Sequence, residues 1–131
     1  MKTKIAINGF GRIGRLFFRT LLENDFLNNS IEVVAINDTT DATNLLYLLK
    51  YDSVHGRLNY NLKIVDIDFI SVSKYNGEEI CRAKCLSQRV HPSELPWREL
   101  GAEIIIEATG AFTKGKDAAV HLQSGAKKVI I

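Results

Sequence analysis

The chain has 131 residues, of which 46% are hydrophobic and 24% are charged, with 17 basic and 15 acidic side chains. That size and composition are typical of one globular domain with its own core. The small net charge of +2 gives no reason to expect nucleic acid or an anionic membrane surface as a partner. The longest apolar runs, such as residues 104–106, are far too short to span a bilayer, so no membrane is expected either.

The first strand-like run begins at Lys4, which leaves no room for a signal peptide before it. Cys81 and Cys85 are the only two cysteines. Without a secretion signal they are expected to be reduced thiols in a cytoplasmic protein. The sequence offers them no second pair of ligands, so we expect them to pack on or near a strand face and not to bind zinc.

An apolar run at residues 4–8 ends at Gly9 and predicts a buried parallel strand. From Arg12 onward the apolar spacing becomes that of a helix. The residues expected on the buried face of this helix are Ile13, Leu16, Phe17 and Leu21. A second strand is predicted at residues 31–37, so residues 4–37 form a unit of two parallel strands joined by a helix.

Asp41 is placed to cap a further helix. The apolar residues of that helix are Leu45, Leu46, Leu48 and Leu49. The stretch 57–86 has a different pattern, because it contains strand-like runs at residues 62–65, 69–73 and 79–85. Asn76 and Gly77, between the last two runs, are a strong signal for a two-residue hairpin turn. We therefore predict an antiparallel excursion outside the alternation of strand and helix.

The alternation resumes with a strand at residues 103–108 and a helix at about residues 117–123, which Gly125 ends. Residues 127–131 look like a strand in the interior of a sheet. A domain rarely ends on such a strand with nothing to cover it. The sequence is therefore expected to be truncated.

Residues 9–14 fit the pattern G-x-G-x-x-G, directly after one predicted strand and at the start of a helix. In that place Gly9 permits the tight turn, Gly11 lets the backbone approach a pyrophosphate, and Gly14 lets the helix pack close to the sheet. Free N–H groups and the positive end of the helix dipole then meet the phosphate charge. Glycines that only shape a tight turn are the plainer alternative. The context favours a dinucleotide-binding site.

The elements and this motif together predict an α/β fold of the Rossmann type. Its sheet is expected to be doubly wound and mainly parallel, with the antiparallel excursion, and incomplete at the C-terminus. Residues 1–131 are expected to form one NAD(P)-binding domain, without a catalytic domain.

Asp38 closes the second predicted strand, 24 residues beyond Gly14. A carboxylate there accepts hydrogen bonds from the adenosine ribose diol and repels a 2′-phosphate, which favours NAD over NADP. The alternative is that Asp38 only caps the following turn. Thr39 and Thr40 are small, so NADP stays open as a cofactor.

Thr109 and Gly110 end the third parallel strand. Ligands of open α/β sheets sit at the carboxyl ends of strands, where the strand order reverses. Thr109 is thus placed to touch the cofactor and Phe112 to flank the adenine, although an ordinary strand-to-loop turn explains the spacing equally well. The histidines are scattered and have no serine, cysteine or carboxylate arranged with them as a catalytic set; they are His55, His91 and His121.

The sequence resembles the glyceraldehyde-3-phosphate dehydrogenase family over essentially its whole length. Five segments carry the resemblance in order: residues 8–15 (NGFGRIGR), 48–56 (LLKYDSVHG), 95–97 (LPW), 107–113 (EATGAFT) and 125–131 (GAKKVII). The resemblance implies a Rossmann domain that binds NAD in extended form across the sheet, in a homotetrameric enzyme.

The resemblance also assigns parts of the cofactor to particular residues. Arg12 and Ile13 contact the pyrophosphate, with Asn8 beside it, while Asn37 and Asp38 hold the adenosine end. The adenine and ribose side is lined by Arg89, Thr109, Gly110 and Phe112. The full set of expected cofactor-binding residues is Asn8, Gly9, Phe10, Gly11, Arg12, Ile13, Gly14, Asn37, Asp38, Arg89, Thr109, Gly110 and Phe112.

The activity that the resemblance implies is the glycolytic oxidative phosphorylation of an aldehyde, with hydride transfer to NAD. The family's nucleophilic cysteine stands in a Ser-Cys-Thr-Thr-Asn motif, which this sequence does not contain. Neither Cys81 nor Cys85 has those surroundings, and the substrate domain and catalytic histidine are also missing. No catalytic or metal-binding residue is therefore expected, and the chain alone should bind cofactor without turning it over.

Three alternatives remain open from the sequence. Erythrose-4-phosphate dehydrogenase resembles residues 95–101 (LPWRELG), although that branch tends to have glutamate where Asp38 stands. The chain could also be a dinucleotide-binding fragment with no catalysis, which predicts cofactor binding without aldehyde-dependent NADH formation. As a non-functional remnant, it would instead self-associate through exposed sheet and apolar surface.

Overall fold

The structure is a computed structural model that describes residues 2–52, 56–86, 94–110 and 120–131. Its helices are α1 (Arg12–Glu23), α2 (Phe26–Asn29), α3 (Ala42–Lys50), α4 (Trp97–Leu100) and α6 (Val120–Gln123). Its strands are β1 (Thr3–Asn8), β2 (Ile31–Asn37), β3 (Tyr51–Asp52), β4 (Gly56–Arg57), β5 (Asn61–Val65), β6 (Phe69–Ser73), β7 (Glu79–Cys85), β8 (Ile104–Glu107) and β9 (Lys128–Ile130).

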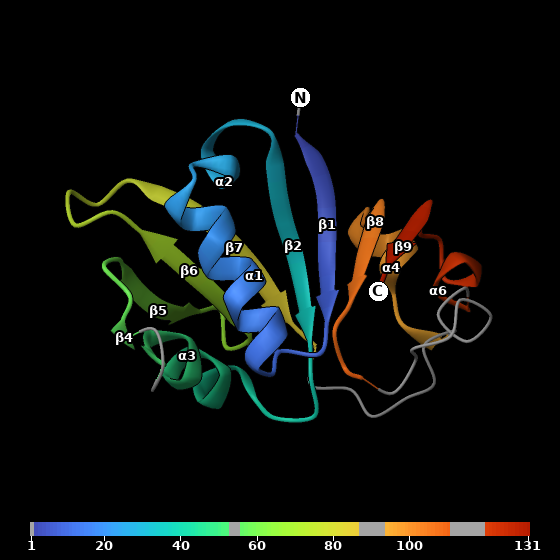
Figure 1. Ribbon diagram of the computed structural model, residues 1–131, viewed down its shortest axis with the longest axis horizontal. Coiled ribbons are helices and arrows are strands. Elements are labelled where there is room, and N and C mark those ends of the chain that lie inside the picture. The colour runs from blue at the N-terminus through green and yellow to red at the C-terminus, as the bar shows by residue number, and fades with distance from the viewer. Residues whose placement is uncertain (1, 53–55, 87–93, 111–119) are drawn as a thin grey trace.

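Seven of these strands form one sheet in the order β5-β6-β7-β2-β1-β8-β9 (Figure 1). β1 pairs in parallel with β2 on one side and β8 on the other, and β9 continues the parallel part beyond β8. β7 joins β2 in parallel, whereas β5, β6 and β7 are antiparallel to one another. The predicted Rossmann-type sheet, mainly parallel with an antiparallel excursion, is confirmed.

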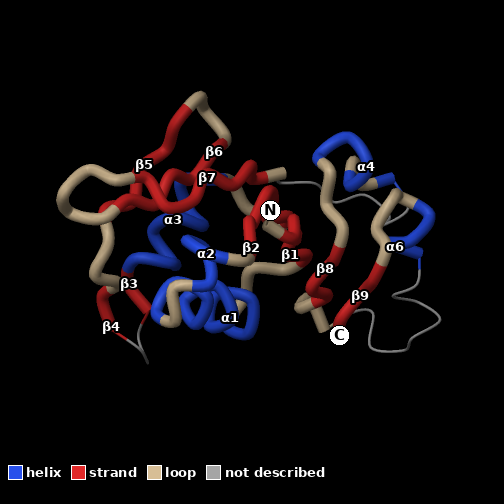
Figure 2. Tube along the Cα trace, turned by 90° about the horizontal axis from the view of Figure 1, so that it is seen from above, coloured by secondary structure: helices blue, strands red, loops and turns tan. Residues whose placement is uncertain are grey.

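Helices lie on both sides of this sheet. Figure 2 shows α1, α2 and α3 on one side and α4 on the other. The side chains of β1 alternate accordingly: Ile5 and Ile7 belong to the larger core, with Phe18 of α1, while Ala6 belongs to a second core with Trp97 of α4. Because strand side chains alternate between faces, one short strand supplies both cores.

The buried face of α1 differs from the predicted one. The helix buries Gly14, Phe18, Arg19, Leu21 and Leu22, whereas Ile13 is 64% exposed and Leu16 is also exposed. Of the predicted face, Leu21 is buried and Phe17 half-buried. The glycine sets the helix rotation, because α1 packs closest to the sheet where it has no side chain, and positions four, seven and eight residues after Gly14 then face the core.

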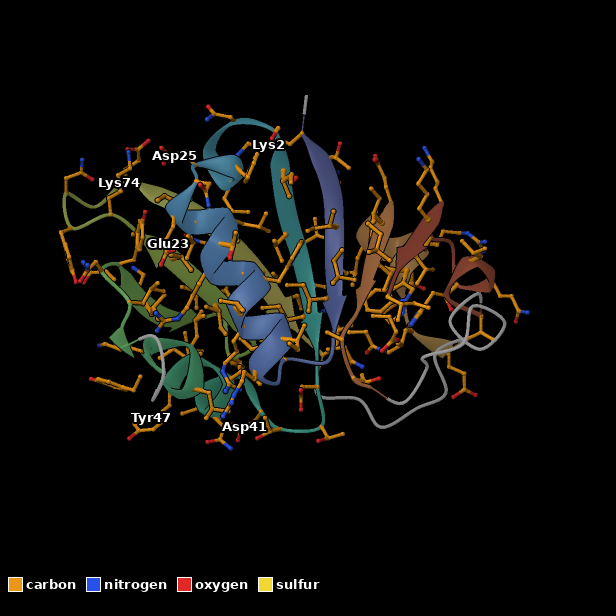
Figure 3. The ribbon with its side chains drawn as sticks, in the orientation of Figure 1. Lys2, Glu23, Asp25, Asp41, Tyr47 and Lys74 are labelled. Carbon is orange, nitrogen blue, oxygen red and sulfur yellow. The ribbon has the colours of Figure 1, made fainter. Side chains whose placement is uncertain are left out.

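The predicted cap and hairpin are both present. Asp41 stands at the start of α3 (Figure 3), where its Oδ1 accepts a hydrogen bond of 2.9 Å from the Asn44 N–H. The hairpin between β6 and β7 turns through residues 74–78, and only Gly77 there has a positive φ, of +95°. A two-residue turn of the expected type needs positive φ at both central positions. The turn is therefore longer than predicted.

Residues 128–130 form the predicted parallel strand, which is an outer strand of the described sheet. β9 pairs with β8 on one side only, and Ile130 is 52% exposed. An apolar run of this length does not distinguish a strand with two neighbours from one with a single neighbour. The predicted helix at 117–123 is present from Val120 onward, and its first three residues lie outside the described ones.

The two cysteines lie on β7, where both are buried and free. Burial raises the pKa of the Cys81 thiol and of the Cys85 thiol from 9.0 to about 12. Their predicted packing on a strand face is confirmed. Within the described part of the chain, no three metal-binding side chains gather into a cluster. No helix there combines the length and apolar character that crossing a membrane requires.

Candidate dinucleotide-binding site

The carboxyl ends of β1, β2 and β8 lie level with one another at one edge of the sheet (Figure 1). In the strand register Asn8 stands opposite Asn37 of β2 on one side and opposite Glu107 of β8 on the other. The chain leaves β1 toward β2 and later returns to the far side of β1 as β8. Such a reversal of strand order is where open α/β sheets bind ligands.

The glycine loop after β1 is shaped by close backbone contacts. Gly9 has φ +97°, and a Cβ there would lie 2.7 Å from both the N and the Cγ2 of Thr109. A Cβ on Gly14 would overlap the carbonyl oxygen of Gly9. Around Gly11, in contrast, a Cβ would meet nothing within 4 Å. The structural roles predicted for Gly9 and Gly14 are therefore confirmed, and Gly11 borders open space.

The loop leads directly into α1, whose first N–H groups point out of its N-terminal end. The first turn of a helix has no intrahelical acceptors for these donors. Arg12 and Ile13 stand in this turn with exposed side chains. The Phe10 side chain is instead buried, with its ring edge-on to Phe18 at 6.0 Å between centroids. The Phe10 side chain therefore packs in the core, and only the Phe10 backbone belongs to the surface of the glycine loop.

Asp38 lies just beyond the end of β2, with its carboxylate turned toward the glycine loop. Its Oδ2 accepts a hydrogen bond of 2.7 Å from the Phe10 N–H, and its Oδ1 accepts one of 2.6 Å from the Thr39 N–H. The side chain is half-buried. Its Oδ1 also accepts a longer hydrogen bond of 3.4 Å from the Thr39 hydroxyl, so the carboxylate is held between the loop and the β2 end with a lone pair left on Oδ2 for a further donor.

Beneath the loop, buried amide and carboxylate side chains join the three strand ends. Asn37 Nδ2 donates to Asn8 Oδ1 at 2.9 Å, and Asn8 Nδ2 donates to Glu107 Oε1 at 2.8 Å. Glu107 Oε2 accepts from the Thr109 N–H at 3.1 Å and from the Thr109 hydroxyl at 2.6 Å. All three strand ends are therefore linked to the loop that follows β8.

Two further side chains, His121 and Trp97, extend this hydrogen-bond network away from the strand ends. His121 Nε2 lies 2.6 Å from Glu107 Oε1, and Trp97 Nε1 donates to His121 Nδ1 at 2.9 Å. Glu107, His121 and Trp97 are all buried. Burial raises the pKa of Glu107, but the hydrogen bonds from His121, Thr109 and Asn8 outweigh it, so the pKa lies below the ordinary value of 4.5.

The structure brings together most of the residues that the sequence singled out. Asn8, the glycine loop, Asn37, Asp38, Thr109 and Gly110 meet at one edge, whereas Arg89 and Phe112 lie outside the described residues. Sequence reasoning missed Glu107 and Trp97, and it did not foresee the contact between His121 and Glu107. A signal existed, because Glu107 is a charged residue in an otherwise apolar strand directly before the Thr-Gly turn.

This arrangement fits a dinucleotide. Gly11 leaves open space beside a helix N-terminus, where a phosphate meets free N–H groups. Asp38 offers a carboxylate one strand away, where a ribose diol donates hydrogen bonds. Fold and site together define a dinucleotide-binding domain of the Rossmann type.

Comparison with known proteins identifies the particular family. The sequence model described as "Glyceraldehyde 3-phosphate dehydrogenase, NAD binding domain" matches residues 3–115. The chain therefore belongs to the family of glyceraldehyde-3-phosphate dehydrogenase NAD-binding domains, and NAD is the cofactor of that family.

Similar proteins carry the same name. The glyceraldehyde-3-phosphate dehydrogenase of Geobacillus stearothermophilus is 50% identical over 131 residues, and that of Priestia megaterium is 53% identical over 131 residues. The protein of this name from Mycobacterium avium is 46% identical over 132 residues. Each match covers 100% of this chain and 36%, 36% and 37% of the relative, respectively, so the chain spans about a third of the length of these relatives.

Proposed function

We propose that NAD binds at the carboxyl ends of β1, β2 and β8, with its pyrophosphate at the start of α1. The N–H groups of Arg12 and Ile13 hold the pyrophosphate there, and Gly11 leaves it room. Asn37 and Asp38 hold the adenosine ribose, while Thr109 and Gly110 border its other side. The proposed set is completed by Asn8, Gly9, Phe10 and Gly14, with Arg89 and Phe112 assigned by resemblance alone.

The observation that carries this proposal is the position of the Asp38 carboxylate. The Phe10 and Thr39 N–H groups hold it beside the glycine loop, and Oδ2 keeps a lone pair for a hydroxyl of the ribose diol. A carboxylate so placed also repels a 2′-phosphate. This supports NAD as the preferred cofactor over NADP.

The activity that we propose for the whole protein is that of its family, an NAD-dependent, phosphorylating aldehyde dehydrogenase of glycolysis. NAD supplies the hydride acceptor when it is bound. This chain contributes the cofactor site and no nucleophile, because its two cysteines are buried and their pKa values are raised to about 12. We propose that residues 1–131 are one such domain, inactive alone.

The assembly and compartment are also proposals. The resemblance supports a homotetramer for the whole protein. The two free thiols support the reducing cytoplasm as its compartment. Neither proposal is needed for cofactor binding by this chain.

Calorimetric titration of the chain with NAD⁺, and separately with NADP⁺, tests the proposed site. We expect saturable binding that favours NAD⁺. The variant Asp38→Ala should weaken NAD⁺ binding and lower the ratio of NAD⁺ to NADP⁺ affinity by about tenfold. The reason is that a charge-assisted hydrogen bond and the repulsion of a 2′-phosphate are both lost.

Asp41→Ala is the matched control. It removes a carboxylate three residues away, together with the cap of α3, which lowers the free energy of unfolding by about 1 kcal/mol. Its ratio of NAD⁺ to NADP⁺ affinity should equal that of the unmodified chain. If the folded chain gives no heat with either cofactor, the proposed site is wrong. An unchanged ratio in Asp38→Ala would refute the role of that carboxylate.

A further inference from the structure

The geometry points to Glu107 and His121 as positioning residues for the cofactor. Both are buried, at 4% and 0% exposure, and Glu107 contacts Asn8 and Thr109 at the strand ends. We infer that they fix which hydrogen-bonding groups Asn8 and Thr109 present at the strand ends. The inference rests on the proposed function, because it takes those strand ends as the NAD site.

The proton on His121 is placed by Trp97. An indole N–H can only donate, so the imidazole nitrogen that faces it, Nδ1 at 2.9 Å, must accept. In a neutral imidazole the other nitrogen, Nε2, then carries the proton and donates to Glu107 Oε1 at 2.6 Å. A doubly protonated ring would turn a second donor toward the indole N–H. The geometry therefore favours the neutral ring with its proton on Nε2.

Glu107 is the point at which the donors converge. A carboxylate only accepts hydrogen bonds. Its Oε1 accepts from Asn8 and His121, and its Oε2 accepts from the N–H and the hydroxyl of Thr109. Four donors thus surround one buried negative charge, which is the condition under which a buried carboxylate is tolerated.

This arrangement determines the orientation of the Asn8 amide. Its NH₂ group must face the carboxylate, so its Oδ1 faces β2 and can only accept. Asn37 must then turn its own NH₂ group toward Asn8, as its 2.9 Å hydrogen bond shows. Reversing either amide would set two donors or two acceptors against each other in a buried position. Trp97, His121 and Glu107 therefore specify both amides at the β1 and β2 ends.

The same carboxylate determines what the Thr109 hydroxyl offers. Its single proton is donated to Glu107 Oε2 at 2.6 Å, so toward any other group the oxygen can only accept. Thr109 is exposed at the β8 end. A ligand group in contact with it must therefore donate a hydrogen bond, as a ribose hydroxyl does. A phosphate oxygen, which only accepts, is disfavoured at this position.

The test compares NAD⁺ affinity, measured by calorimetry, in variants of the chain. Glu107→Gln replaces two of the acceptor positions with an NH₂ group, and we expect it to weaken NAD⁺ binding about tenfold or more. Glu79→Gln is the matched control, since it removes the same charge from β7, where Glu79 accepts from the Ser71 hydroxyl and pairs with Arg82. Its NAD⁺ affinity should stay within about twofold of that of the unmodified chain.

A second pair of variants separates positioning from mere support of the fold. His121→Gln keeps one donor and one acceptor, whereas His121→Leu keeps the bulk and removes both. Both changes disturb packing and should lower the thermal midpoint. We expect only the leucine variant to lose NAD⁺ affinity, while the glutamine variant stays within about threefold. This pair keeps the inference testable if Glu107→Gln does not fold.

The possible outcomes distinguish the inference from the proposal beneath it. If the unmodified, folded chain does not bind NAD⁺, the proposed function fails, and this inference fails with it. If that chain binds and folded Glu107→Gln binds equally well, only the inference is overturned. Equal losses of affinity in the two His121 variants, at equal thermal midpoints, would also overturn it, because preserved polarity would then have made no difference.

Discussion

At the scale of single residues, the proposed NAD site includes Asn8 and Thr109, whose side chains hydrogen-bond to the buried Glu107 beneath them. Sequence patterns singled out residues that follow strand ends, such as Asp38 and Thr109. They did not predict the pairing of Glu107 with His121, which lie 14 residues apart on different elements. That pairing depends on how α6 sits against β8, and no local spacing encodes such a contact.

The Glu107 carboxylate should make stability depend on pH in a definite direction. Its pKa in the folded chain lies below the ordinary value of 4.5, so folding favours the charged form. The stabilisation that the charged Glu107 carboxylate gives the folded chain is therefore complete above pH 4.5. It is lost as the pH falls below 4.5 through the folded-state pKa.

Urea unfolding of the chain and of Glu107→Gln, from neutral pH to below pH 4.5, measures this contribution. Other carboxyl groups are common to both proteins, so the difference between the two free energies of unfolding isolates Glu107. We expect the unmodified chain to be the more stable at neutral pH and the difference to shrink in acid. A difference that stays constant across the range would contradict the charged state assigned to Glu107.

At the scale of elements, the sequence predicted which helices and strands occur better than it predicted how they face the core. β1, α1 and β2 were identified because the spacing of apolar residues changes from that of a strand to that of a helix and back. The rotation of α1 was not, because apolar residues occur on more than one side of it and Ile13 is exposed. The contact of Gly14 with the Gly9 carbonyl oxygen decides the rotation, and the spacing of apolar residues does not register that contact.

Gly11, in the glycine loop, and Gly14, in α1, should respond in different ways to the same added methyl group. Gly14→Ala should destabilise the fold by about 2 kcal/mol or more, since its Cβ overlaps the Gly9 carbonyl oxygen and lies 3.3 Å from the Ile7 Cγ2. Gly11→Ala adds a Cβ that meets nothing within 4 Å, at an ordinary φ of −76°. Its stability should change by less than about 0.5 kcal/mol, while its NAD⁺ affinity falls.

Denaturant unfolding and NAD⁺ titration of both variants check this contrast. Each variant serves as the control for the other, because the substitution is chemically identical. If Gly11→Ala binds NAD⁺ as the unmodified chain does, the open space beside it is not where the pyrophosphate lies. If Gly14→Ala is as stable as the unmodified chain, the contact does not set the position of α1.

At the scale of the whole molecule, the fold class followed from the order of elements, but the outer strand did not. The apolar run at residues 127–131 resembles an interior strand, and whether a second strand flanks it is decided by partners that a local pattern does not contain. In the described sheet β9 is an outer strand. The side chains of Ile130, in β9, and of Ile131, directly after it, are exposed.

An outer strand with exposed isoleucines favours pairing with another copy of the chain. We expect the elution volume on a sizing column to decrease as protein concentration rises. Ile130→Lys places a charge on this strand and should shift the chain toward the monomer. Tyr75→Lys, at an exposed apolar position in the hairpin turn between β6 and β7, is the control and should not. Concentration-independent elution of the unmodified chain would refute pairing at β9.

Trp97 is the only tryptophan of the chain, and its buried indole donates its N–H to the His121 imidazole. Light absorbed selectively by tryptophan therefore excites one known position, where α4 meets α6 through this hydrogen bond. The emission thus becomes an unlabelled optical gauge of whether these two helices stay packed together in the interior of the fold.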